Sequence, residues 1–226
     1  MKFSWRTEWP HWLLLAVMFV LAATTWGSSP ERIPVHWNIA GHVDRWGGKF
    51  EGLLAVPLLA LGIYALLLVV PRLDPGRANY AAFAGPYATI RLGTLVVLAV
   101  IYALVVLWVR GVRVNMEVWV PLIVGGLFVV VGNVLGKVRP NWFVGVRTPW
   151  TLSSKVSWTR THRAGGWLFV LMGVLFMVTA VLRSAWAVWV LLGASVVGVA
   201  GLIVYSYVQW RRDPEKTPPA GTRPAD

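Results

Sequence analysis

The 226-residue sequence contains no cysteine. This absence excludes disulfide frameworks, thiol nucleophiles and Cys-ligated metal centres, so a metal would need His, Asp or Glu ligands. Charge is also scarce, because only 13% of the residues are charged, against roughly 25% in an average soluble domain. Acids are the rarer sign, with 9 Asp and Glu against 21 Lys and Arg.

Apolar residues make up 57% of the chain, and the mean hydropathy is +0.64. Each apolar run is near the length of about 20 residues that a helix needs to cross a bilayer. The sequence therefore predicts an all-α polytopic membrane protein, a bundle of six transmembrane helices, with no room for a separate soluble enzyme domain. The runs cover residues 11–26, 53–70, 92–109, 118–135, 167–182 and 186–208.

The first run has features of a secretory signal peptide, because Lys2 and Arg6 precede its apolar core. Its exit, "TTWGSS", places Trp26 where a signal peptidase requires small residues. We therefore expect an uncleaved membrane anchor.

Positive charge is distributed unequally between the two sides of the predicted bundle. With a cytoplasmic N-terminus, fifteen Lys and Arg fall on the cytoplasmic side and six outside. The positive-inside rule then predicts a multi-pass membrane protein with both termini cytoplasmic. We divide it into residues 1–70, with an outer loop at 27–50; residues 71–208, with a basic inner loop at 137–164; and a Pro-rich tail, 209–226, expected to be disordered.

The spans themselves carry little chemistry, because their middle thirds contain no Asp, Glu, Lys, Arg or His. This argues against a coupled transporter. Glu51, Arg91 and Glu117 lie near helix ends, where we expect them to snorkel to the interface. Asn133 lies beside Gly132 and Gly136, a spacing typical of close helix packing.

The outer loop contains two histidines and an aspartate, His36, His42 and Asp44. Imidazole and carboxylate suit zinc, so these residues form a candidate metal site for a membrane metalloenzyme. Their spacing matches no metal motif, however, and we favour a structural or partner-binding role without a cofactor. We expect Asn38 and Asp44 to hydrogen-bond nearby backbone groups, as short polar side chains do in turns.

The inner loop is basic and has no acid between residues 137 and 163. Pro149 predicts a turn, and Thr151, Ser153 or Ser154 can cap the helix that follows. On that helix Trp158, His162, Gly165 and Phe169 share one face. If this face packs on the bundle, Arg147 is presented to the cytoplasm; the alternative is an interfacial elbow without a partner.

Two stretches carry a resemblance to a known family. "IPVHWNIAGHVDRW" resembles the signature of a small domain of unknown function in bacterial membrane proteins, and "NWFVGVRTPWTLSSKVSWTRTHRAGGWLF" resembles the signature of the SdpI family. The resemblance implies an immunity protein of the bacterial plasma membrane that protects the cell from a secreted, membrane-active peptide toxin. It also implies signalling by holding a transcriptional repressor at the membrane, and no enzymatic activity.

The resemblance implies binding sites in both loops, with membrane lipids, an extracellular amphipathic peptide and a cytoplasmic repressor as partners and no direct nucleic-acid contact. A lipid or peptide transporter is a further alternative. The candidate residues of the outer loop are His36, Trp37, Asn38, Gly41, Asp44 and Trp46. Those of the inner loop are Asn141, Phe143, Gly145, Arg147, Thr148, Pro149, Trp150, Thr151, Ser153, Ser154, Trp158 and His162.

Overall fold

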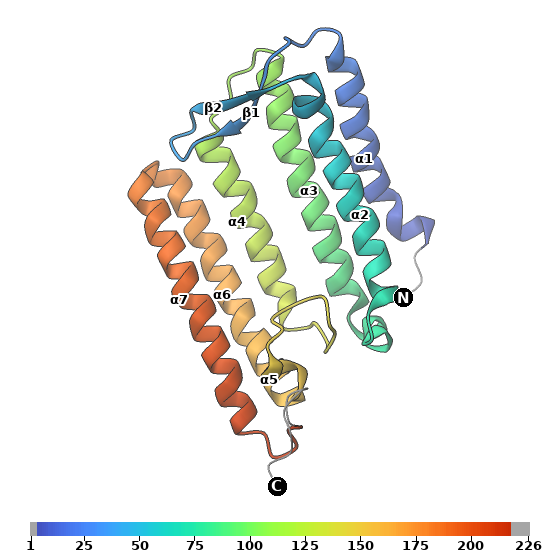
Figure 1. Ribbon diagram of the computed structural model, residues 1–226, viewed down its shortest axis with the longest axis vertical. Helices are drawn as coiled ribbons and strands as arrows, with labels where there is room; N and C mark the ends of the chain where they lie inside the picture. Colours follow the sequence, from blue (N-terminus) through green and yellow to red (C-terminus); the bar gives the residue numbers. More distant parts are fainter. Residues whose placement is uncertain (1–3, 218–226) are drawn as a thin grey trace.

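The computed structural model, which describes residues 4–217, is a bundle of long helices with a β-hairpin across one end (Figure 1). Six of the described helical segments are long and apolar enough to cross a membrane, which confirms the predicted all-α six-span bundle. The elements are α1 (Trp5–Trp26), β1 (Ile33–Trp37), β2 (Val43–Gly47), the π-helix η1 (Phe50–Leu54), α2 (Ala55–Leu73), the 3-10 helix η2 (Arg77–Phe83), α3 (Ala84–Val109), α4 (Met116–Leu135), α5 (Pro149–Leu152), α6 (Lys155–Leu182) and α7 (Ala185–Arg211).

The spans expose most of their apolar surface. In no span is more than 33% of the most apolar window buried inside the protein. Water would make that exposure costly, whereas lipid tails accept it. The chain is therefore a multi-pass membrane protein whose outer helix faces contact lipid.

Helices α4 and α6 form the most extensive helix contact, and glycines bring their backbones together. A Cβ at Gly132 would lie 2.7 Å from the Gly166 carbonyl oxygen, and one at Gly125 would lie 2.6 Å from that of Gly173. Any side chain at these positions would push the helices apart, as at other small-residue contacts in membranes.

Of the two other residues in the predicted packing motif, Asn133 lies outside this contact and Gly136 lies within it. Asn133 is exposed, and its amide donates to the Val129 carbonyl of its own helix (2.8 Å). A Cβ at Gly136 would lie 3.5 Å from Arg163, an ordinary contact that does not require glycine.

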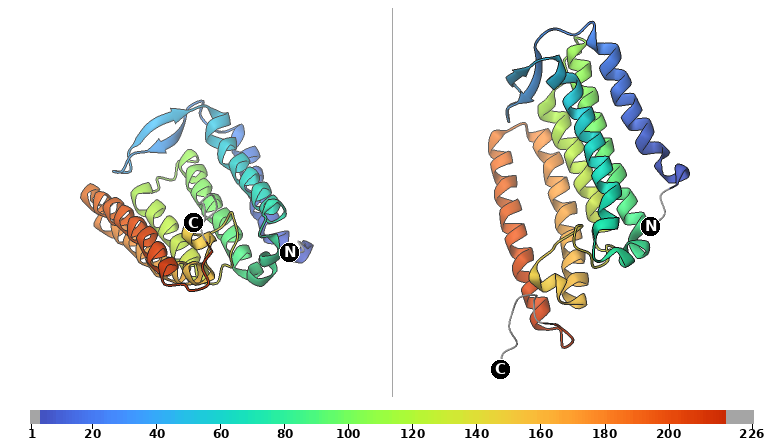
Figure 2. Two further views of the ribbon diagram at one scale, coloured as in Figure 1. Left: turned by 60° about the horizontal axis from the view of Figure 1, so that its bottom comes forward. Right: turned by 45° about the vertical axis from the view of Figure 1, so that its right-hand side comes forward.

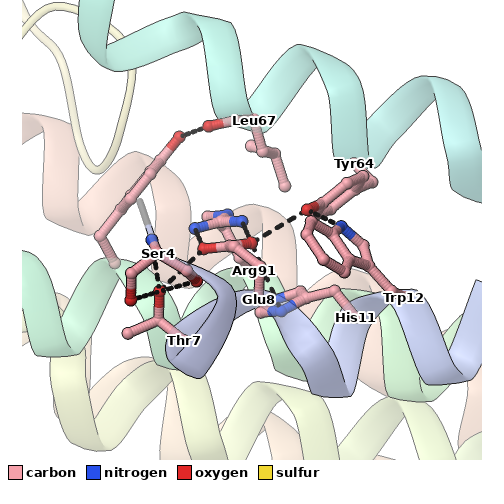
Figure 3. A network of polar contacts seen from close by, with 9 residues as sticks. Ser4, Thr7, Glu8, His11, Trp12, Tyr64, Leu67 and Arg91 are labelled. Carbon is pink, nitrogen blue, oxygen red and sulfur yellow. Dashed lines mark hydrogen bonds and ion pairs between the residues drawn. The ribbon is translucent and has the colours of Figure 1, made fainter. Parts of the chain in front are cut away.

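Helix α1 lies at the edge of the bundle opposite α7 and is fastened to α3 through charge (Figure 2). The Arg91 guanidinium donates to both carboxylate oxygens of Glu8, with 3.2 Å between Nη1 and Oε1 (Figure 3). Arg91 is 1% exposed and Glu8 4%. The prediction that Arg91 snorkels to the interface is wrong, because an acid on another helix compensates its charge within the bundle.

Two aromatic residues and a histidine lie beside this ion pair (Figure 3). The Tyr64 hydroxyl donates to Glu8 (3.0 Å) and accepts from the Trp12 indole N–H (2.6 Å). His11 is buried 3.7 Å from the Glu8 carboxylate, and neither of its ring nitrogens has a hydrogen-bond partner among the described residues.

The other end of α1 is also held by an arginine. Arg110, at the end of α3, donates to the hydroxyls of Thr24 and Thr25 at 2.8–3.2 Å. Helix α1 is thus fastened to α3 at both ends, and it leads directly into the hairpin.

The predicted start of the disordered tail is wrong. Helix α7 continues to Arg211, and Asp213, 3% exposed, accepts a hydrogen bond from the Ser154 hydroxyl (2.5 Å). That bond lowers the pKa of Asp213. The segment packs on the inner loop, as in the hydrogen bond from the Thr217 N–H to the Ser153 carbonyl (3.1 Å). Lys2, Arg223 and the rest of the tail, 218–226, lie outside the described residues.

Candidate functional site

The outer loop folds into an antiparallel hairpin whose turn is built by Asn38. Its side-chain oxygen accepts the N–H groups of Ala40 and His42, both at 3.0 Å, as expected for an Asn turn. Asp44 differs from the expectation, because it pairs with the His36 ring across the strands (2.6 Å) rather than with backbone. The pair fixes the hairpin from its exposed face.

Two further contacts seat the hairpin on the bundle. Gly41 has φ +74° and lies against Glu117 at the start of α4, so a side chain there would be strained and crowded. The Trp46 ring packs edge-on against Trp108 of α3, with 5.5 Å between ring centroids.

The alternative metal site is not assembled. Among residues 4–217 no three His, Asp or Glu side chains gather closely enough to share a metal ion. His36 and Asp44 instead satisfy each other, which leaves the proposed set of three without a common centre.

Beneath the hairpin lies a cavity of about 400 Å³, bounded by β1 and the ends of α3, α4, α6 and α7. This volume falls within the range of ligand pockets, roughly 300–1,000 Å³. Much of the lining is apolar, including Val105, Met116, Phe176, Val188 and Leu191. The cavity can therefore receive an apolar group.

Polar groups at the same cavity come from helix ends. Glu117 begins α4, and Arg183 ends α6 in a left-handed conformation, with φ 49°. Such a backbone conformation is uncommon outside glycine and costs free energy. An acid and a cation thus border an apolar interior, an arrangement that suits an amphipathic ligand.

The hairpin borders the cavity through five consecutive residues, Val35 to Ile39. Val35, His36 and Trp37 belong to β1, and Asn38 and Ile39 belong to the turn that follows. Of the outer-loop candidates, His36, Trp37 and Asn38 line the cavity, whereas Gly41, Asp44 and Trp46 support the hairpin.

The inner loop is folded around Asn141, which is 2% exposed. Its side-chain oxygen accepts the N–H groups of Phe143 and Val144, and its amide donates to the carbonyls of Arg139 and Val144. Asn141 is therefore the centre of the loop rather than a contact for a partner.

His162 fastens this loop to α6. Its Nε2 accepts the Val146 N–H (3.1 Å), and its Nδ1 bonds the Trp158 carbonyl (2.8 Å). Gly145 has φ +107°, and a Cβ there would lie 2.2 Å from Nε2. The predicted packing face of this helix is confirmed, since Trp158, His162 and Gly165 are buried.

Hydroxyl groups cap the N-termini of α5 and α6. Thr148 caps α5 in a capping box with Thr151, Pro149 occupies the first turn, and Ser154 caps α6. The Thr148 hydroxyl also meets Ser206 of α7 (3.0 Å). The Ser153 hydroxyl donates to the Pro149 carbonyl, and the Trp150 ring packs edge-on against the Tyr207 ring. These two contacts complete the elbow.

Asp74 is a residue of this site that the sequence did not reveal. Its carboxylate, 1% exposed, accepts the Trp142 N–H (3.1 Å), the Tyr80 hydroxyl (2.8 Å) and the Gly76 N–H (2.6 Å). It joins the connection between α2 and α3 to the inner loop. A single acid before Pro75 carries no signal of a partner 68 residues away.

The loop leaves Trp142, Phe143 and Arg147 exposed, and we term these three residues the inner surface. The cations Lys137, Arg139 and Lys155 of the same loop are exposed as well. Arg147 donates one hydrogen bond to the Trp142 carbonyl (2.8 Å). No ion pair of the described residues involves Arg147, so its guanidinium retains donors for a carboxylate.

Comparison with known proteins finds two regions of this chain that match family models. Residues 137–206 match the model of the SdpI/YfhL protein family, and residues 13–61 match a domain of unknown function, DUF1648. The chain is 21% identical over 187 residues to Immunity protein SdpI of Bacillus subtilis (strain 168), covering 80% of this chain and 84% of that protein. No solved structure matches.

The two matched regions coincide with the two loops and the helices beside them, and the relative spans most of the chain. The match to the SdpI/YfhL protein family, over residues 137–206, includes the whole inner loop, α6 and most of α7.

Proposed function

We propose that this protein is an immunity protein of SdpI type that protects a bacterium from a membrane-active peptide toxin. It acts by binding rather than by catalysis. Its similarity to Immunity protein SdpI supports the role, and the cavity beneath the hairpin supplies a place for the peptide.

The observation that carries the proposal is the composition of this cavity. A peptide that attacks membranes is amphipathic, so its receptor needs an apolar space beside polar groups. Val188 and its apolar neighbours provide the apolar space, and Glu117 and Arg183 provide the polar groups. The excess of Lys and Arg at the opposite end of the bundle supports an extracytoplasmic hairpin, which the toxin would meet first.

Complementation tests this role. The gene is expressed in Bacillus subtilis lacking its own Immunity protein SdpI, and survival beside the wild-type strain is counted. We expect protection to be restored. Full membrane expression without protection would contradict the proposal.

For the cytoplasmic side we propose that the inner surface binds a transcriptional repressor. Its exposed aromatics and its single cation suit a protein partner that offers an acid. An arginine binds a carboxylate through two parallel hydrogen bonds, and lysine cannot reproduce that geometry.

Arg147→Lys and Arg147→Ala therefore should both weaken repressor recruitment, measured by its co-sedimentation with membranes, while expression stays normal. The exposed Arg160→Lys, on α6, is the matched control. Recruitment that Arg147→Lys leaves intact would reduce Arg147 to a topology determinant, because the positive-inside rule counts both residues alike.

A further inference from the structure

The turn between α6 and α7 borders the cavity beneath the hairpin with two polar residues, Arg183 and Ser184. It lies at the end of the bundle that carries the hairpin (Figure 1). The chemical group that the cavity recognises in a ligand depends on what these two side chains can bind.

The backbone of Arg183 is the first indication. Arg183 has φ 49° and ψ 42°, and within residues 4–217 no other residue except glycine has a positive φ. Helices often end in this conformation with glycine, which adopts it without steric cost. An arginine here costs stability that a glycine would not, which points to a use for its side chain.

The side chains of the turn have donors to offer. The Arg183 guanidinium makes no hydrogen bond or ion pair with the part of the chain that the structure describes; only its backbone N–H is bonded, to the Thr179 carbonyl (3.0 Å). Ser184 is the N-cap residue of α7, but its hydroxyl makes no capping hydrogen bond. A guanidinium and a hydroxyl are thus both available to a ligand in the cavity.

The other charge at the cavity determines where an anion can sit. Glu117 begins α4, and its carboxylate forms no ion pair with Arg183 or with any other described residue. A carboxylate of a ligand is repelled by Glu117 and attracted by Arg183, so it can be held only at the α6–α7 turn. The lining beside the turn is apolar, including Val188 and Leu191.

We propose that Arg183 and Ser184 bind a carboxylate of the peptide toxin, and that the apolar segment next to this carboxylate fills the cavity. The guanidinium can hold both carboxylate oxygens through two parallel hydrogen bonds, and the serine hydroxyl can donate a third. This assignment rests on the proposed immunity function, because it takes the toxin as the ligand.

Two small probes test the site without the toxin. Decanoate has a carboxylate at the end of an apolar chain, and decanamide has the same shape without the charge. Binding of each radiolabelled probe to the full-length protein in phosphatidylcholine nanodiscs is measured by equilibrium dialysis at alkaline pH, with empty nanodiscs subtracted. We expect Arg183→Gly to weaken decanoate binding about ten-fold, the size of a lost charge-assisted contact, and to leave decanamide binding unchanged.

Arg32→Gly is the matched control, because Arg32 is exposed in the outer loop but does not line the cavity. Since glycine adopts the backbone conformation of residue 183 freely, Arg183→Gly should not lower the thermal melt by circular dichroism. Absent or equal binding of the two probes by the wild-type protein would overturn the proposal, as would equal losses in Arg183→Gly and Arg32→Gly.

A lipid phosphate could occupy the same donors, and nanodiscs of phosphatidylglycerol distinguish this source. Decanoate binding that disappears in them would assign the site to lipid and overturn the proposal, whereas retained binding supports it. Complementation tests the immunity function separately. Selective decanoate binding by a protein that does not protect would contradict that function and leave the carboxylate site in place.

Discussion

A charge inside a membrane protein is tolerated only with a partner, and Glu8 and Arg91 provide that partner for each other. The chain separates them by 83 residues. Sequence position alone placed Arg91 near a helix end, where snorkelling costs less. The pairing could not be predicted, because it depends on how α1 packs against α3. Asn141 and Gly145 were found by their motif, but their roles inside the loop became apparent only from its folded contacts.

Replacing Glu8 by Gln should destabilise the protein by about 3–5 kcal/mol, because the buried Arg91 would lose the carboxylate with which it pairs. His11→Phe, one turn along the same helix, should change stability by about 1 kcal/mol or less, since neither ring nitrogen is hydrogen-bonded. Unfolding in mixed detergent micelles, followed by circular dichroism, measures both.

The double variant Glu8→Gln, Arg91→Leu controls for this interpretation, because it removes both charges of the ion pair. It should recover much of the lost stability. Equal stability of Glu8→Gln and the wild-type protein would mean that the ion pair does not fasten α1.

At the scale of elements, apolar runs predicted the six spans. The capping residues predicted that a helix begins well before the apolar run at residue 167, and α6 does begin at Lys155, after its cap Ser154. Hydropathy alone would count its first turns as loop, because Ser157, Thr161 and His162 are polar yet face the bundle. The hairpin was missed, since its short strands are held by the Asn38 turn and by contacts with helix ends distant in sequence.

The same limit applies to the candidate site. His36, Trp37 and Asn38 were identified from the outer loop, whereas Glu117 and Arg183 were not identified as parts of one cavity. Each is a charged residue at the end of an apolar run. Only the arrangement of α3, α4, α6 and α7 shows which ends meet beneath the hairpin.

For the molecule as a whole, orientation is the first property to measure. The chain has no cysteine, so single cysteines can be introduced without background. Ala40→Cys and Lys155→Cys are suitable, because both positions are exposed, whereas Gly41 is strained and Ser154 buried. We expect an impermeant maleimide to label residue 40 in intact cells and residue 155 only after permeabilisation; the reverse pattern would contradict the assigned orientation.

The central claim is that toxin protection depends on the cavity beneath the hairpin, and filling that cavity tests it most directly. Val188 lines the cavity, whereas Val190 on the same helix is 60% exposed toward lipid. In the Bacillus subtilis complementation assay, at matched membrane expression, the wild-type protein and Val190→Phe should protect. Val188→Phe should reduce survival at least about tenfold, equivalent to roughly 1.4 kcal/mol of lost peptide binding. Full protection by Val188→Phe would contradict the claim.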